Sequence, residues 1–86
     1  NLNKIIIAYE PLWSIGTGII PKIEDIVSIH NYIKKSIFLE NNTKIVYGGS
    51  VKANNCKKII NLKEVDGLLV GGASLNLDEF NKIIEF

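Results

Sequence analysis

The residues of this chain that could do chemistry come directly after its apolar segments. Glu10 follows the run at residues 5–9, and Pro11 comes next. A carboxylate fixed at the end of a buried strand can serve as a general base, because desolvation raises the pKa of a carboxyl group towards neutrality. Taken alone, however, Glu10 is better explained as an ordinary solvated acid at the start of a loop.

Glycine-rich loops accompany this carboxylate. Gly16-Thr17-Gly18 fails as a dinucleotide fingerprint, because no third glycine follows at the required spacing and the helix starts later. Gly48-Gly49-Ser50 and Gly71-Gly72-Ala73-Ser74 each end an apolar segment. Bare glycines let the backbone approach an anion, and N–H groups that open a helix attract negative charge. Two such loops in succession favour a phosphate site, with two ordinary turns as the alternative.

Strands and helices that alternate along the chain must position these loops. Continuous apolar runs that end in glycine or in Glu10 predict strands at residues 5–9, 44–47 and 65–70. Helical spacing of apolar residues predicts helices at 23–38, 53–60 and 77–86. The order βαβαβα requires a parallel sheet with helices outside it. Three strands leave two bare sheet edges, so the sequence predicts more strands than it contains.

The predicted helices carry apolar stripes and correctly placed charges. Acidic residues open the first helix and lysines close it, as the helix dipole favours. The expected core positions are Ile23, Ile26, Val27, Ile33 and Ile37 in the first helix and Phe80, Ile83 and Ile84 in the third. The continuous apolar run at 5–9 indicates a strand that is covered on both faces.

Composition excludes several classes of protein. Hydrophobic residues make up 47% and charged residues 22% of the 86 residues, which excludes a disordered tail. The net charge of +1 provides no basic patch for nucleic acid, and no apolar run approaches the roughly 18 residues of a membrane helix. Cys56 is alone, so no disulfide framework or cysteine-based metal site is expected. The absence of Met and the start at Asn1 indicate a piece of a longer protein.

Residues 8–18, which read AYEPLWSIGTG, resemble the sixth strand and mobile loop of the triosephosphate isomerase family. Residues 47–51 (YGGSV) resemble the end of its seventh strand, and residues 69–75 (LVGGASL) the end of its eighth. The motifs occur in the family's order and spacing across nearly the whole chain. The resemblance implies an α/β fold in which residues 1–86 form a partial TIM-barrel domain. This domain would hold the last three βα units of a (β/α)8 barrel, strands 6 to 8 with their helices, without the N-terminal part.

The resemblance also implies a function. The family interconverts dihydroxyacetone phosphate and glyceraldehyde 3-phosphate through an enediol(ate), as an aldose-ketose isomerase of glycolysis and gluconeogenesis. Glu10 matches its catalytic base. The residues that match backbone donors to the substrate phosphate are Gly16, Ser50, Gly71 and Gly72.

The implied partners are a small triose phosphate, the missing N-terminal barrel segment and, in the family, a second copy in a homodimer. No cofactor, metal, nucleic acid or membrane is implied, and the expected location is the cytoplasm. The family's electrophilic His and active-site Lys lie in earlier βα units. The 86-residue chain alone is therefore expected to be inactive.

Other residues have simpler structural interpretations. We expect His30 to pack within the apolar stripe of the first helix and Cys56 to be a small structural residue in the second. Trp13 is expected to pack at the base of the loop rather than to contact a ligand. A solvated face is the expected place of Lys52, Lys57 and Lys58.

Pro21 departs from the family pattern. The family tyrosine that Tyr47 matches meets a backbone N–H at this far hinge of the mobile loop, and proline has no N–H. We therefore expect loop closure to depend on Ser50 and on the loop backbone more than on Tyr47.

Two alternatives stay open. Another phosphate-binding barrel, such as one from tryptophan or histidine biosynthesis, shares the glycine-rich strand ends. Such a barrel is not expected to carry Glu10-Pro11 six residues before Gly16. The other alternative is an inactive split-gene or degraded remnant, which could keep Glu10 and the phosphate loops after activity is lost.

Overall fold

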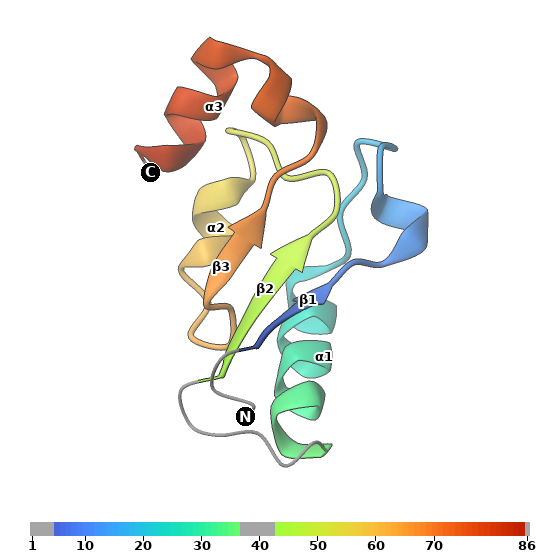
Figure 1. Cartoon of the computed structure of the whole chain (residues 1–86). Helices are drawn as coiled ribbons and strands as arrows, with labels where there is room; N and C mark the ends of the chain where they lie inside the picture. Colours follow the sequence, from blue (N-terminus) through green and yellow to red (C-terminus); the bar gives the residue numbers. More distant parts are fainter. Residues whose placement is uncertain (1–4, 37–42, 86) are drawn as a thin grey trace.

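Three parallel strands organise the fold. The computed structural model describes residues 5–36 and 43–85. The strands form one sheet in the order β1-β2-β3 (Figure 1), with the bounds β1 Ile6–Tyr9, β2 Lys44–Gly48 and β3 Gly67–Leu69. All three overlap the apolar runs that predict them, although β3 is shorter than predicted at both ends. The parallel α/β arrangement expected from the sequence is therefore confirmed for the described residues.

The register of the sheet aligns the strand ends. Tyr9 pairs with Tyr47, and Tyr47 pairs with Leu68. Because the strands are parallel, the loops that follow them leave the sheet at the same edge, at the top of Figure 1. This edge brings together segments that are far apart in the sequence.

The helices differ from the predicted ranges mainly at their ends. Their bounds are α1 Ile23–Ser36, α2 Cys56–Ile60 and α3 Leu77–Ile84, with short 3-10 helices η2 at Leu12–Ser14 and η3 at Gly72–Leu75. Residues 37, 38 and 86 of the predicted helices lie outside the described residues. The first turn of α3 is capped by Asn76, whose Oδ1 accepts the Glu79 N–H at 3.0 Å.

A turn delays the start of α2 by three residues relative to the predicted start at residue 53. In this turn the Lys52 N–H donates to Asn55 Oδ1 at 2.9 Å, while the Asn55 N–H donates to the Lys52 carbonyl at 3.1 Å. The asparagine side chain thus competes with helical bonding, as asparagine commonly does in turns.

Asp66 explains why β3 begins later than predicted. Its N–H donates to the Ile45 carbonyl at 2.9 Å, and its Oδ2 accepts the Ile45 N–H at 2.9 Å. The same carboxylate lies 3.4 Å from Lys34 Nζ of α1. The Asp66 carboxylate therefore accepts a backbone N–H of the middle strand that a backbone carbonyl would otherwise accept. Regular pairing between β2 and β3 starts one residue later, at Gly67.

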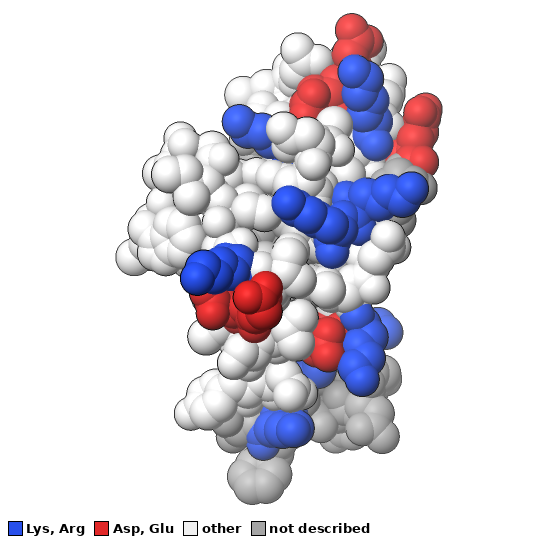
Figure 2. All heavy atoms as spheres, turned by 180° about the vertical axis from the view of Figure 1, so that it is seen from behind, with Lys and Arg blue, Asp and Glu red and all other residues white. Residues whose placement is uncertain are grey.

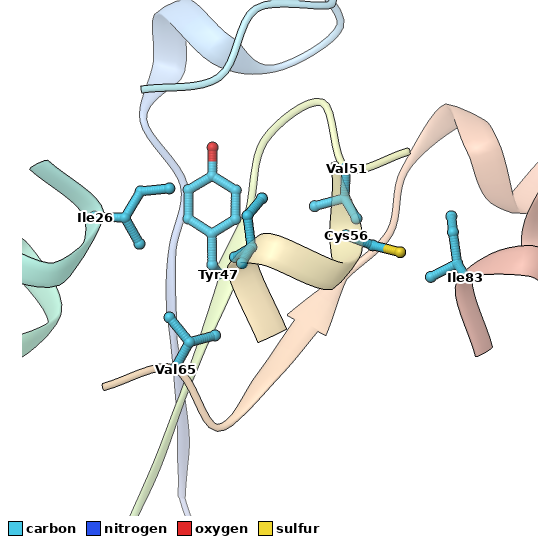
Figure 3. Packing of buried hydrophobic residues seen from close by; sticks show 7 residues of the cluster. Ile26, Tyr47, Val51, Cys56, Val65 and Ile83 are labelled. Carbon is cyan, nitrogen blue, oxygen red and sulfur yellow. The ribbon is translucent and has the colours of Figure 1, made fainter. Parts of the chain in front are cut away.

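The hydrophobic core lies between the sheet and its helices. Tyr47 stands between Ile26 of α1 and Val51 (Figure 3), and it is completely buried. Ile59 of α2 and Ile83 of α3 extend the same cluster. One face of the sheet is thus covered by α1 and α2, which connect the strands, and α3 after the last strand adds Ile83 to the same core.

The expectation that the first strand is covered on both faces is wrong for the described residues. Burial alternates along β1, and Ile6 is 68% exposed. Ile6 and Ala8 lie on the face opposite the helices, where no described residue covers them. The expectation that Ile84 lies in the core is also wrong, because this side chain is 59% exposed at the rim of a groove between α3 and β3.

Charged side chains of both signs are interspersed over the face seen in Figure 2, so no extended patch of one sign covers it. Among the helices that the structure describes, none has the length and apolar character needed to cross a bilayer.

His30 has the packing role expected from its place on α1. It is completely buried, its Nδ1 lies 3.1 Å from the Glu64 carbonyl, and its ring contacts the Tyr9 and Tyr47 rings edge-on or tilted. Its Nε2 has no hydrogen-bond partner among the described residues. Burial lowers the pKa of His30, although the Glu64 carbonyl opposes this shift and Lys34, Asp66 and Glu64 add smaller effects of both signs.

Acidification is therefore expected to destabilise the fold through His30. Since the folded pKa is lowered, the unfolded chain binds more protons once the pH falls below about 6.5, and the free energy of unfolding then decreases. The urea midpoint of a complete protein that contains residues 1–86 should therefore fall as the pH is lowered from about 7.5 to about 5.5. His30→Gln, which does not titrate in this range, should remove most of that change. An equal loss in both chains would show that His30 is not the responsible group.

Candidate functional site

A cavity of about 520 Å³ opens at the edge of the sheet where the three strands end. This volume falls within the range of small-ligand sites. Its wall combines residues that follow β1, β2 and β3. Every residue that the sequence singled out for chemistry lies on this wall, namely Glu10, Gly16, Ser50, Gly71 and Gly72.

Glu10 lies across the end of β2. A Cβ at Gly48 would be 3.0 Å from Glu10 Cγ and 3.3 Å from Glu10 Oε1, and also 3.2 Å from Leu69 Cβ. Gly48 therefore leaves the space that the carboxylate side chain occupies. The expected desolvation of Glu10 is not present, because the residue is exposed on the sheet face that no described residue covers.

A strained turn after β2 orients Ser50. Gly49 has a φ of 136°, and a Cβ there would lie 2.8 Å from the Tyr47 hydroxyl. Ser50 itself has a φ of 52°, which is uncommon for a residue with a side chain. Asn55 Nδ2 donates to the Ser50 carbonyl at 2.9 Å and holds this conformation from the start of α2. This supporting role of Asn55 was not predicted from the sequence.

The segment between β1 and α1 is bonded to that turn. The Gly18 N–H donates to Ser50 Oγ at 2.8 Å, and Ser50 Oγ donates to the Ser14 carbonyl at 2.5 Å. Gly16 and Gly18 have positive φ values of 72° and 81°, which glycine adopts without strain. Residues 11–20, hereafter the loop, thereby form part of the cavity wall at Ile15, Gly16 and Gly18.

Tyr47 bonds to its own turn rather than to the segment around Pro21. Its hydroxyl donates to the Gly49 carbonyl at 3.0 Å and lies 3.4 Å from Ser14 Oγ. Burial raises the pKa of the Tyr47 hydroxyl, which therefore stays protonated at neutral pH. The Gly18 N–H instead bonds the loop to the Ser50 hydroxyl. That loop closure depends on Ser50 and the loop backbone more than on Tyr47 stays a prediction.

The backbone after β3 is open to the cavity. A Cβ at Gly71 or at Gly72 would meet no atom within 4 Å, so the protein itself leaves free space beside both α-carbons. Ser74 closes the following 3-10 turn, donating from its N–H at 2.9 Å and from its Oγ at 2.6 Å to the Gly71 carbonyl. A ligand atom could approach this backbone closely.

Lys52, Lys57 and Lys58 are exposed, as expected. Lys52 also lines the cavity, with its Nζ 3.6 Å from the position of a Cβ on Gly18. One residue lies elsewhere than the sequence predicted. Trp13 is 56% exposed, so it does not pack at the loop base as expected. Cys56 is buried and free, as expected.

The described residues include no group of three His, Cys, Asp or Glu side chains that could hold a metal ion. The groups that these residues do place around the cavity are the Glu10 carboxylate, the Ser50 hydroxyl, the backbone of the glycine-rich loops and the Lys52 ammonium group. A parallel α/β sheet with such a cavity at the carboxyl ends of its strands defines the class of α/β proteins that bind small ligands at this edge.

Comparison with known proteins narrows this class. Residues 1–86 match the family model for triosephosphate isomerase. Triosephosphate isomerase from Francisella tularensis subsp. holarctica is 51% identical over 89 residues, which covers 98% of this chain and 35% of that protein. The Helicobacter pylori triosephosphate isomerase is 46% identical over 86 residues, covering 100% of this chain and 36% of that protein. The chain belongs to the triosephosphate isomerase family, and it spans about a third of the length of these relatives.

The close approach at Gly48 predicts a steric effect on stability. We would measure it in a graft, in which residues 1–86 replace the matching third of the Francisella tularensis protein. Gly48→Ala should lower the free energy of unfolding by about 1–3 kcal/mol, because the new Cβ displaces the Glu10 side chain or Leu69. Gly72→Ala is the matched control, since a Cβ there meets no atom within 4 Å and the residue opens η3, whose helical backbone alanine adopts without strain. Equal urea midpoints for both variants would contradict the close packing at Gly48.

Proposed function

We propose that this chain provides the sixth, seventh and eighth βα units of a triosephosphate isomerase barrel. In the completed barrel it would interconvert dihydroxyacetone phosphate and glyceraldehyde 3-phosphate. The observation that carries the proposal is the meeting of Glu10, the Ser50 turn, the Gly71-Gly72 backbone and the loop around one cavity. Family membership supports it independently.

Glu10 is the general base in this proposal. Its carboxylate takes a proton from C1 of dihydroxyacetone phosphate, and the electrons of the broken C–H bond form the enediol(ate). Glu10 then gives this proton to C2, while the proton of the C1 hydroxyl passes to the C2 oxygen, which gives glyceraldehyde 3-phosphate. Gly48 keeps the space beside β2 free, so the carboxylate can reach over the sheet end to a substrate in the cavity. The reaction only moves protons within one molecule, so carboxylate chemistry needs no redox cofactor.

The substrate phosphate is assigned to the donor-rich part of the cavity. Gly16, Ser50, Gly71 and Gly72 line it from three loops, and Lys52 adds a positive charge at its border. Backbone N–H groups that approach a phosphate closely stabilise its charge without a large side chain. The loop, bonded through Gly18 to Ser50, would cover the bound substrate and exclude water from the enediol(ate).

Completion of the barrel must supply what these 86 residues do not. The uncovered face of the sheet, on which Ile6 and Glu10 lie, would become the barrel interior. The electrophile that polarises the substrate carbonyl would come from the other βα units. We further propose that the complete protein is a cytoplasmic homodimer, as the family resemblance implies.

Substitution of Glu10 tests the catalytic assignment in the graft. Glu10→Gln should lower kcat by at least about 100-fold, because the amide cannot take up the proton. Glu10→Asp should lower kcat far more than it changes KM, since the shorter side chain misses the proton while phosphate contacts stay in place. Glu24→Gln, on the exposed side of α1, is the matched control and should leave both constants unchanged.

The measurement is the steady-state rate of the graft and its variants with each of the two triose phosphates. A folded but inactive unmodified graft would contradict the proposed function and favour a remnant. Proportional changes in kcat and KM for Glu10→Asp would instead show that Glu10 only positions the substrate.

The 86-residue chain alone should be inactive and poorly ordered. The exposed strand edges and the uncovered sheet face leave a small core, and electrostatic stabilisation of the substrate carbonyl is missing. Its circular dichroism and amide protection should increase when the N-terminal two thirds of the Francisella tularensis protein are added. Turnover by the chain alone, or sharp cooperative unfolding without the added segment, would disprove this prediction.

A further inference from the structure

Ser14 is a buried polar residue inside the loop. It ends η2 and has no exposed surface. Its Oγ donates to the Ile19 carbonyl near the far end of the loop, and it lies 3.4 Å from the Tyr47 hydroxyl in the core. One side chain therefore connects the beginning of the loop, its end and the middle strand of the sheet.

The main chain of Ser14 is bonded as extensively as its side chain. The Ser14 carbonyl accepts Ser50 Oγ at 2.5 Å and Thr17 Oγ1 at 3.2 Å. Ser50 Oγ in turn accepts the Gly18 N–H at 2.8 Å. A displacement of Ser14 would thus move the Ser50 hydroxyl away from Gly18.

Proton counting shows why the Ser14 hydroxyl matters. Each hydroxyl has a single proton to donate. Ser14 donates its proton to the Ile19 carbonyl, while Tyr47 shares its proton between the Gly49 carbonyl and Ser14 Oγ. Pro21 has no N–H with which the segment after the loop could bond to Tyr47. Ser14 is therefore the residue through which the Tyr47 hydroxyl reaches the far end of the loop.

We propose that Ser14 is a positioning residue that holds the loop over the cavity. Its hydroxyl fixes the Ile19 end of the loop against Tyr47, and its carbonyl fixes Ser50, so that the Gly18 N–H stays on Ser50 and Gly16 stays on the cavity wall. The effect of Ser14 on the rate of turnover rests on the proposed isomerase function. Its effect on the position of the loop is independent of that function.

Turnover in the graft tests the first consequence. Ser14→Ala should lower kcat/KM about three- to tenfold, which is the effect expected from losing one hydrogen bond of ordinary strength. The loss should appear mainly as a higher KM for triose phosphate, because the loop backbone leaves the phosphate side of the cavity. Ser14→Thr keeps a hydroxyl and should recover kcat/KM to within about twofold. Ser28→Ala, on the exposed surface of α1, is the matched control and should have no effect.

Amide hydrogen exchange in the graft tests the second consequence without any turnover. Ser14→Ala should accelerate exchange at Gly18 and Ile19 about threefold or more, while amides of β2 keep their protection. Unchanged exchange at Gly18 and Ile19 would overturn the proposal, as would equal acceleration throughout the sheet, which would indicate general destabilisation. If the unmodified graft is inactive, the proposed function fails, but the exchange result still decides the role of Ser14.

Discussion

The lateral pairing of Tyr9 with Tyr47 and of Tyr47 with Leu68 sets the level at which the three strands end. Residue 10 follows the first tyrosine, Gly48 follows the second, and Leu69 follows the leucine. These three positions therefore lie side by side on one face of the sheet, where the Glu10 side chain crosses Gly48 next to Leu69. A shift of one residue in this register would turn Glu10 to the other face. The position of the carboxylate thus depends on backbone pairing more than on any contact of its own.

The two faces of the sheet have different surroundings. Tyr47 and Ile45 are buried against the helices, whereas Ile6 and Glu10 are exposed on the opposite face. An apolar strand residue that is two-thirds exposed loses most of the stabilisation that burial would provide. The exposed face is therefore costly for the chain as it stands, and it is the same face that carries the carboxylate. The exposed apolar residue and the carboxylate on this face have one explanation if further strands close the sheet into a barrel with this face inside.

The turn after β2 connects this rigid sheet to the loop. Its backbone is strained at Ser50, and such strain persists only where surrounding contacts fix it. Asn55 fixes it from the α2 side, and the Tyr47 hydroxyl fixes it from the core by donating to Gly49. The Ser50 hydroxyl is thereby held in place to receive the Gly18 N–H. Packing in the core and the position of a surface loop are linked through this one turn.

The sequence alone determined the order of elements and the chemical identity of the site. Uninterrupted β-branched runs place β1 and β2 to within one residue at each end, and the first helix begins at Ile23 as its apolar stripe and its acidic first turn predict. Glu10 and the glycine-rich strand ends were recognisable because each depends on residues that are adjacent in the chain. The family motif lies in these same local segments, so it could be recognised without any knowledge of packing.

Only the tertiary structure decided which side chains support that site and which faces are covered. Ser14 reaches the Tyr47 hydroxyl of β2, Asn55 holds the Ser50 carbonyl across the turn before α2, and Lys52 lines the cavity. Ile84 belongs to an apolar stripe in the sequence but meets no covering partner among the described residues. Periodicity fixes the direction in which a side chain points from its own element, whereas burial and hydrogen bonding depend on what lies opposite. That second quantity is a property of contacts between distant parts of the chain, and it exists only after folding.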